Sequence, residues 1–146
     1  MGRQAVILAG GRGTRLGEIT RHTPKPLLQV NGRPFITLLM DELRRYGFDN
    51  IVLLVGNHGA TFERAMANYP TPDMRVEMVP EPEPAGTAGA LVHAADILKP
   101  RFLLLNGDSF FDFNILNLVT AKSAQPWIAR IALRHLKNSG RYGAVQ

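Results

Sequence analysis

The chain has 146 residues, of which 45% are hydrophobic and 20% are charged, and its formal net charge is +5 at pH 7. This length and composition predict one domain with a real hydrophobic core and exclude a globally disordered chain. Cysteine is absent, which excludes disulfides, thiolate metal sites and cysteine nucleophiles.

The first apolar segment, Ala5 to Ala9, is too short for a signal-peptide core or a membrane span. We therefore expect a cytoplasmic protein that does not bind membranes. The same segment predicts a buried strand, and Gly10 and Gly11 end it.

Helix and strand patterns alternate along the rest of the chain. Residues 34–46 predict a helix with one apolar face, and Gly47 suits the position after its end. Residues 80–85 predict an extended loop, because their three prolines forbid a helix. Trp127 is expected in the core, at the start of the last strand. The further predicted strands are 51–55, 74–79, 101–105 and 127–133, and the further helices are 58–68, 86–98 and 115–123.

This alternation predicts an α/β fold, a Rossmann-like three-layer α/β/α arrangement with a mostly parallel sheet. Such sheets bind ligands at the carboxyl ends of the strands, near the point where the strand order reverses. The loop 10–15 follows the first strand and Asp108 follows the fourth. We therefore expect them to meet at one site.

The basic residues contain no long run, and their densest group lies close to the first glycines: Arg12, Arg15, Arg21, His22 and Lys25. A compact basic group in a glycine-rich segment favours a small phosphate ligand over a polynucleotide. The sequence also lacks a basic stripe with stacking aromatics. Nucleic-acid binding is therefore the weakest interpretation of the positive charge.

The glycine-rich segment that follows the first strand matches neither of two common phosphate-binding motifs. No G-x-x-x-x-G-K-[ST] string occurs, which excludes a Walker loop. Counted from Gly11, the sixth position of G-x-G-x-x-G is Leu16, and the second strand is not followed by the expected ribose-binding acid. A nicotinamide-dependent dehydrogenase is therefore disfavoured.

Extended to longer strings, the sequence resembles the sugar-1-phosphate nucleotidyltransferases. The resemblance covers essentially the whole chain, and it looks closest to the bacterial heptose-1-phosphate guanylyltransferases, with the N-acetylmuramate-1-phosphate uridylyltransferases as near neighbours. The strings that carry it are Leu8 to Leu16, Pro24-Lys25-Pro26-Leu27, Pro84-Ala85-Gly86-Thr87-Ala88-Gly89, Leu105-Asn106-Gly107-Asp108 and Arg141-Tyr142-Gly143.

The resemblance implies transfer of a nucleoside monophosphate from a nucleoside triphosphate to a sugar 1-phosphate. Arg15, Lys25 and Asp108 are the implied catalytic residues, with the two cations on the phosphates and Asp108 holding Mg²⁺. The implied nucleotide-binding residues are Leu8, Ala9, Gly10, Gly11, Gly13, Thr14, Glu81, Gly86 and Thr87. The implied sugar-binding residues are Asn106, Tyr142 and Gly143.

The segment around Glu81 is expected to border the base. A carboxylate accepts hydrogen bonds from both N1–H and the 2-amino group of guanine, whereas uracil offers one such N–H. GTP is therefore favoured over UTP, and Glu81 is preferred over Glu83 by its place in the motif.

Family members are longer than this chain, so the resemblance implies that residues 1–146 are the nucleotide-binding part of a single domain. The C-terminal sugar-binding half, with a second metal carboxylate, would then be mostly absent. An uncovered sheet edge would favour a homo-oligomer. Two alternatives stay open: a uridylyltransferase acting on an amino-sugar 1-phosphate, and a non-catalytic nucleotide-binding fragment or regulatory subunit.

Overall fold

The computed structural model describes residues 2–11, 23–81 and 86–135. The chain divides into two compact units, Met1–Asp112 and Phe113–Gln146. The predicted site residues Gly13, Thr14, Arg15, Tyr142 and Gly143 lie outside the described residues.

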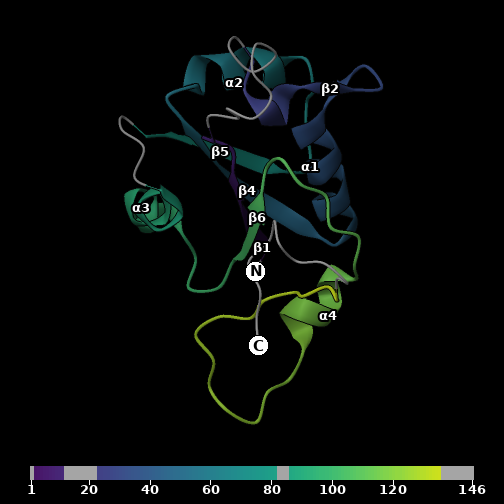
Figure 1. Ribbon diagram of the computed structural model, residues 1–146, viewed down its shortest axis with the longest axis vertical. Coiled ribbons are helices and arrows are strands. Elements are labelled where there is room, and N and C mark those ends of the chain that lie inside the picture. Colours follow the sequence, from purple (N-terminus) through teal and green to yellow (C-terminus); the bar gives the residue numbers. More distant parts are fainter. Residues whose placement is uncertain (1, 12–22, 82–85, 136–146) are drawn as a thin grey trace. The chain divides into compact units, whose positions relative to one another are not determined.

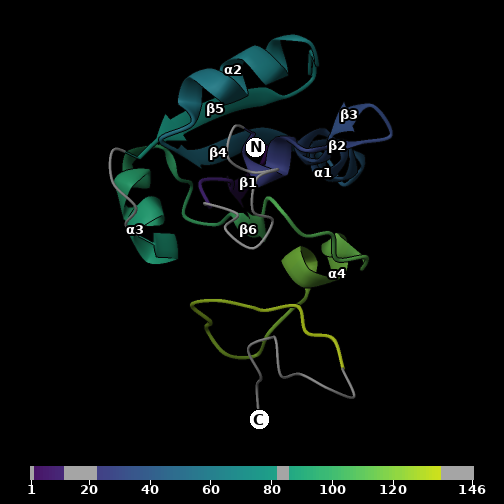
Figure 2. The same cartoon turned by 45° about the horizontal axis from the view of Figure 1, so that its top comes forward.

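The first unit is built on a parallel sheet of four strands in the order β5-β4-β1-β6 (Figure 2). Apolar residues fill the central strands, as expected of strands that are buried on both faces. A smaller antiparallel pair joins β2 to β3. The strands are β1 (Arg3–Leu8), β2 (Gln29–Val30), β3 (Arg33–Pro34), β4 (Phe48–Gly56), β5 (Arg75–Pro80) and β6 (Leu103–Asn106).

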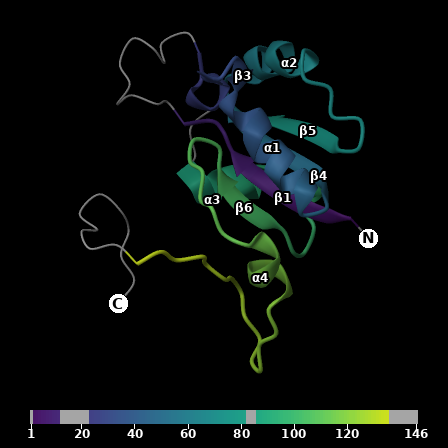
Figure 3. The same ribbon diagram turned by 90° about the vertical axis from the view of Figure 1, so that its right-hand side faces the viewer.

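Helices cover both faces of the sheet. In Figures 1 and 2, α3 lies to the left of the sheet and α1 to its right, and Figure 3 shows α1 running in front of β1 and β4. The helical elements of this unit are η2 (Lys25–Leu27), α1 (Phe35–Arg45), α2 (Gly59–Ala67), α3 (Gly86–His93) and η3 (Ala95–Ile97). The predicted three-layer α/β/α class is thereby confirmed.

Side chains point alternately to the two faces of the sheet, so that apolar residues pack on both faces. Val6, Val52 and Leu54 pack with Ala90 and Ala94 on the α3 side. The intervening strand residues point to the opposite face, where α1 and α2 contact β4. That second face receives the buried stripe of α1, which consists of Ile36, Thr37, Leu39, Met40 and Leu43.

The order of the strands creates a switch point beside β1. The chain proceeds from β1 to β4 and on to β5, and then returns to place β6 on the other side of β1. Register pairs Leu8 with Leu54 on one side and with Asn106 on the other. The residues after β1 and β6 therefore leave the sheet side by side, at the position where such folds bind ligands.

Two features differ from the sequence-based expectations in this unit. Helix α3 ends at His93, and the 3₁₀ turn η3 follows it, where one helix over 86–98 was predicted. A tighter terminal turn of this kind is common where a helix ends. The β2–β3 hairpin was not predicted, because each of its strands has only two residues.

The second unit contains one described helix, α4 (Ile115–Thr120), whose first turn is capped by the Asn114 side chain accepting from Leu116 N at 3.0 Å. The predicted strand 127–133 is wrong, because this segment has no regular structure. Ile128 is 104% exposed and Trp127 40% exposed, so the expected core position of Trp127 is also wrong. No described strand pairs with this segment, and an apolar run without a backbone partner does not form a strand. Instead, the Arg130 guanidinium stacks 4.4 Å from the Trp127 ring centroid.

Throughout residues 2–11, 23–81 and 86–135, no helix has the length and apolar character that a membrane crossing requires.

Candidate active site at the ends of β1 and β6

A lysine and an aspartate meet at the switch point. Lys25 Nζ lies 2.7 Å from Asp108 Oδ2, and the two side chains are 35% and 40% exposed. Asp108 comes two residues after β6, whereas Lys25 begins the 3₁₀ turn η2. Residues 83 positions apart are thus brought into direct contact.

Lys25 is placed by a short rigid turn. Leu27 N donates to Pro24 O at 2.8 Å and Leu28 N donates to Lys25 O at 3.1 Å. Pro26 and Leu27 are buried, whereas the lysine side chain reaches outward. The prolines fix the backbone on both sides of Lys25, so the orientation of its Cα–Cβ bond is set before any ligand arrives.

Asp108 is placed by the pairing of β6 with β1. Gly107 N donates to Leu8 O at 2.8 Å, which extends the sheet contacts by one residue beyond β6. A Cβ at Gly107 would lie 2.8 Å from Leu8 O and 3.3 Å from Pro26 Cγ. The lack of a side chain at Gly107 therefore lets the ends of β6 and η2 come together, which puts Asp108 within reach of Lys25.

The charge state of Asp108 follows from these neighbours. The hydrogen bond from Lys25 stabilises the carboxylate and holds the pKa of Asp108 below its ordinary value. Partial burial opposes this shift, and a hydrogen bond from Ser109 Oγ to Asp108 Oδ1 at 3.0 Å adds to it. Asp108 is therefore an anion at neutral pH, with both oxygens already accepting hydrogen bonds.

The two first glycines after β1 have different surroundings. A Cβ at Gly10 would lie 2.8 Å from the backbone nitrogen of Gly56, so Gly10 is needed for the close approach of the ends of β1 and β4. Around Gly11, no atom of the described residues lies within 4 Å of such a Cβ. Gly11 is exposed and carries no side chain that would shield its backbone from an anion.

The other predicted residues fall around the same carboxyl edge. Ala9 is buried and its backbone N donates to Leu54 O at 2.8 Å, while Glu81 N donates to Gly56 O at 2.9 Å. Asn106 is the last residue of β6, and Gly86 and Thr87 are the first two residues of α3. Leu8 O and Ala9 N are engaged in backbone hydrogen bonds to the neighbouring strands, and the nucleotide-binding role implied for the two residues stays a prediction.

Sequence reasoning placed Lys25 and Asp108 at one site but did not predict their direct ion pair. It also missed Ser109, the second hydrogen-bond donor to Asp108. A serine after an aspartate has no distinctive sequence signal, because this pair is also common in ordinary turns.

Comparison with known proteins gives concordant matches. The family model described as Nucleotidyl transferase matches residues 4–146. A D-glycero-alpha-D-manno-heptose 1-phosphate guanylyltransferase of Campylobacter jejuni is 31% identical over 97% of this chain and 62% of its own length. A mannose-1-phosphate guanylyltransferase of Mycobacterium tuberculosis is 34% identical over 71% of this chain and 29% of its own.

Solved structures agree with these sequence matches. The crystal structure of HddC from Yersinia pseudotuberculosis has a TM-score of 0.66 and 33% identity, covering 74% of this chain and 48% of that one. The same protein complexed with GMP-PN gives a TM-score of 0.63 and 34% identity, with the same coverage of both chains. The present chain thus spans less than two thirds of these relatives.

Proposed function

The chain belongs to the nucleotidyl transferase family, and from that premise we propose that it transfers a nucleoside monophosphate from a nucleoside triphosphate to a sugar 1-phosphate. The observation that carries the proposal is the 2.7 Å pair of Lys25 and Asp108 at the switch point, where β1 also ends and is followed by the exposed Gly11. A cation, a carboxylate and an approachable amide are the groups that a triphosphate substrate requires.

In the proposed reaction, an oxygen of the sugar phosphate attacks the α-phosphorus and forms a new P–O bond. The bond from the α-phosphorus to the bridging oxygen breaks, and pyrophosphate leaves with the electron pair. Both reactants are anions, so positioning and charge neutralisation provide most of the catalysis. We assign Lys25 to the phosphates at the reacting centre, together with Arg15, and the backbone of Gly10, Gly11, Gly13 and Thr14 to the triphosphate.

Asp108 fits a role in holding Mg²⁺. The described residues contain no group of three or more histidine, cysteine, aspartate or glutamate side chains that could hold a metal by themselves. Mg²⁺ is commonly held by one or two carboxylates together with substrate phosphates and water, which matches a single, partly exposed carboxylate. When bound, the ion would neutralise charge on the phosphates.

We assign base recognition to Glu81, Gly86 and Thr87 and propose GTP as the preferred nucleotide. The support is the carboxylate of Glu81, which suits the two N–H donors of guanine, and the guanylyltransferase names of the two relatives described above. Asn106, Tyr142 and Gly143 are assigned to the sugar.

The test is pyrophosphate release from GTP, Mg²⁺ and a panel of heptose and hexose 1-phosphates. We expect release to require all three components, and to be faster with GTP than with UTP. Silence with every pair of nucleotide and sugar phosphate would contradict the proposed reaction.

A second candidate function is nucleotide binding without turnover. It requires only the phosphate-binding groups proposed above, Lys25 among them, and no complete reacting centre. Calorimetry and thermal shift with a nucleotide panel separate the candidates, because a ligand that binds only the folded state raises the melting temperature. Nucleotide binding without pyrophosphate release selects the second candidate. If neither binding nor release is observed, both candidate functions are wrong.

A further inference from the structure

A tight hairpin follows directly after the Lys25 turn. Strands β2 and β3 are joined by Asn31 and Gly32, whose φ angles are 52° and 77°. Two consecutive residues with positive φ are typical of a type I′ turn, the connection that matches the twist of paired strands. Phe35 N donates to Leu28 O at 2.9 Å and closes the base of the hairpin. The backbone of the Lys25 turn therefore continues without a flexible joint into the hairpin.

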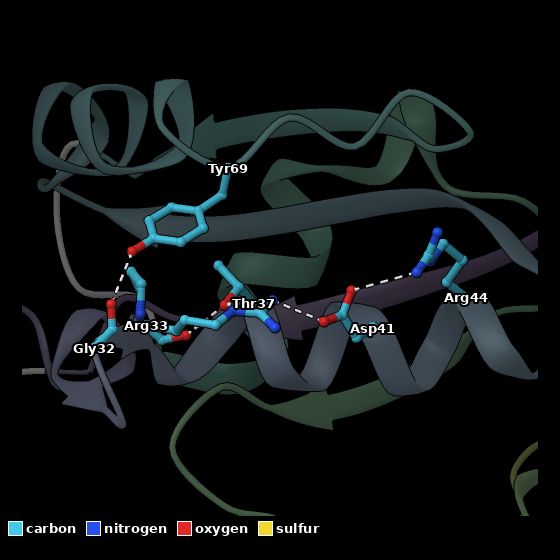
Figure 4. Close-up of polar contacts among 7 residues, drawn as sticks. Gly32, Arg33, Thr37, Asp41, Arg44 and Tyr69 are labelled. Carbon is cyan, nitrogen blue, oxygen red and sulfur yellow. Dashed lines mark hydrogen bonds and ion pairs between the residues drawn. The ribbon is translucent and has the colours of Figure 1, made fainter.

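Two side chains, Tyr69 and Arg33, connect this hairpin to the helical segments on one face of the sheet (Figure 4). Tyr69, which follows α2, donates from its hydroxyl to Gly32 O at 3.2 Å. Arg33 lies along α1 and donates from one nitrogen to Asp41 Oδ2 at 2.7 Å and to Thr37 Oγ1 at 3.3 Å. The tip of the hairpin is thus held by Tyr69, after the end of α2, and its second strand by α1.

The exposure of these contacts argues against a purely stabilising role. The Arg33 and Asp41 side chains are 43% and 45% exposed, and exposed ion pairs contribute little to folding free energy. These contacts matter more for the position of the hairpin than for folding free energy, because each of its strands has only two residues. Thr37, in contrast, is buried and donates to Pro34 O at 2.8 Å, which fixes the end of β3 where α1 begins.

We infer that Tyr69, Arg33 and Asp41 are positioning residues that act through the hairpin on Lys25. A lysine has a long flexible side chain, and ordering it costs conformational entropy when it binds a phosphate. A backbone at Lys25 that is already fixed in the free protein leaves less conformational entropy to be lost when the lysine binds a phosphate. The inference rests on the proposed function, since it requires Lys25 to contact the triphosphate.

The experiment measures binding of GTP and of inorganic tripolyphosphate to the full chain by calorimetry. Tyr69→Phe and Arg33→Met are each expected to weaken binding of both ligands about threefold, as the loss of one net hydrogen bond would. Tripolyphosphate has no base, so an equal effect on both ligands places the loss at the phosphates.

A double-mutant cycle with Lys25→Met distinguishes positioning from general stability. Mutations that act through one residue are strongly non-additive with its removal. In the Lys25→Met background, Tyr69→Phe and Arg33→Met should therefore change tripolyphosphate affinity by less than about 1.5-fold. Arg33→Lys keeps a cation opposite Asp41 and should recover part of the affinity that Arg33→Met loses.

Two matched controls make the same chemical changes elsewhere in the first unit. Tyr46→Phe removes the hydroxyl of a tyrosine at the end of α1, for which no hydrogen bond of the hydroxyl is found among the described residues. Arg75→Met breaks an exposed ion pair to Glu77 at 3.2 Å on β5. Both variants should bind tripolyphosphate as the unmodified chain does.

The outcomes separate the two levels of the argument. If Lys25→Met leaves tripolyphosphate affinity unchanged, the proposed role of Lys25 is wrong. If Lys25→Met weakens binding but Tyr69→Phe and Arg33→Met do not, or if their losses persist in full without Lys25, the positioning inference is wrong and the proposed function stands.

Discussion

The two sides of strand β1 differ in what holds them together and in what they leave accessible. Toward β4, the backbones of Gly10 and Gly56 approach so closely that a Cβ on either would lie 3.0 Å or less from the other residue's backbone. On the β6 side, the carboxyl edge of the sheet carries the Lys25–Asp108 pair, whose side chains are more than a third exposed. Close packing thus fixes β1 against β4, whereas the charged groups of η2 and of the segment after β6 lie exposed at its other side. We expect substitutions on the β4 side to change stability and those on the β6 side to change ligand binding.

Replacing Lys25 is expected to have the largest effect on activity. Lys25→Met removes the cation that neutralises the reacting phosphates, and loss of one such preorganised group commonly lowers kcat by about 100-fold or more. The melting temperature should change little, because the ion pair is exposed. Pyrophosphate release measures the effect, and Lys99→Met, which removes a cation bonded to Gly2 O, is the control. A fall of less than about fivefold would remove Lys25 from the reacting centre.

On the β4 side, the expected loss is in stability. Gly10→Ala should lower the free energy of unfolding by about 1–3 kcal/mol, because its Cβ meets backbone atoms that cannot move aside easily. Gly11→Ala is the matched change, one residue on, where the added Cβ meets no atom of the described residues within 4 Å. Urea denaturation should separate the two variants, and equal transition midpoints would contradict this comparison. Gly11→Ala should instead weaken tripolyphosphate binding.

The third expected effect concerns the base. Glu81→Gln should reduce the preference for GTP over UTP about tenfold, because a charged acceptor for two guanine donors becomes a neutral amide. Glu63→Gln makes the same change at an exposed position of α2 and should leave the preference intact. The ratio of kcat/KM values for the two nucleotides is the measurement. An unchanged ratio in Glu81→Gln would favour the uridylyltransferase alternative.

The smallest expected effect tests the ion pair itself. Without divalent metal, the Asp108 carboxylate competes with an incoming anion for Lys25, so Asp108→Asn should bind tripolyphosphate about twofold to fivefold more tightly. With Mg²⁺ present, the same substitution should weaken binding, because it removes the proposed metal ligand. Calorimetry with and without a chelator measures both, and Asp112→Asn serves as control. Weaker binding under both conditions would show that Asp108 does not restrain Lys25.

The sequence was most informative where local pattern and long-range packing agree. The continuous apolar run around Val6 and Ile7 and the one-sided stripe of α1 predicted the central strand and its covering helix, because burial depends mainly on hydrophobic periodicity. The run 127–133 has similar composition but is exposed. Its structure depends on a pairing partner, which the composition of a single segment cannot reveal.

The candidate site shows the same limit at the level of side chains. Motif strings indicated Lys25 and Asp108 separately, but their contact depends on a close approach that Gly107 permits between β6 and η2. Likewise, Asn31-Gly32 is a known hairpin signal, but strands of two residues on either side are too short to show the alternation that predicts a hairpin. The contact from Tyr69 to Gly32 links residues 37 positions apart and has no local signature at all.

The placement of β1 between β4 and β6 also has a consequence for the sequence of events during synthesis. Val6 pairs with Val52 on one side and with Leu104 on the other, so β1 can join β4 and β5 while β6 has not yet left the ribosome. Contacts between distant parts of a chain cost more loop-closure entropy and form later. We therefore expect a nascent chain to acquire its tightly packed half first, and the lysine and aspartate to come within reach of each other only when the last strand docks.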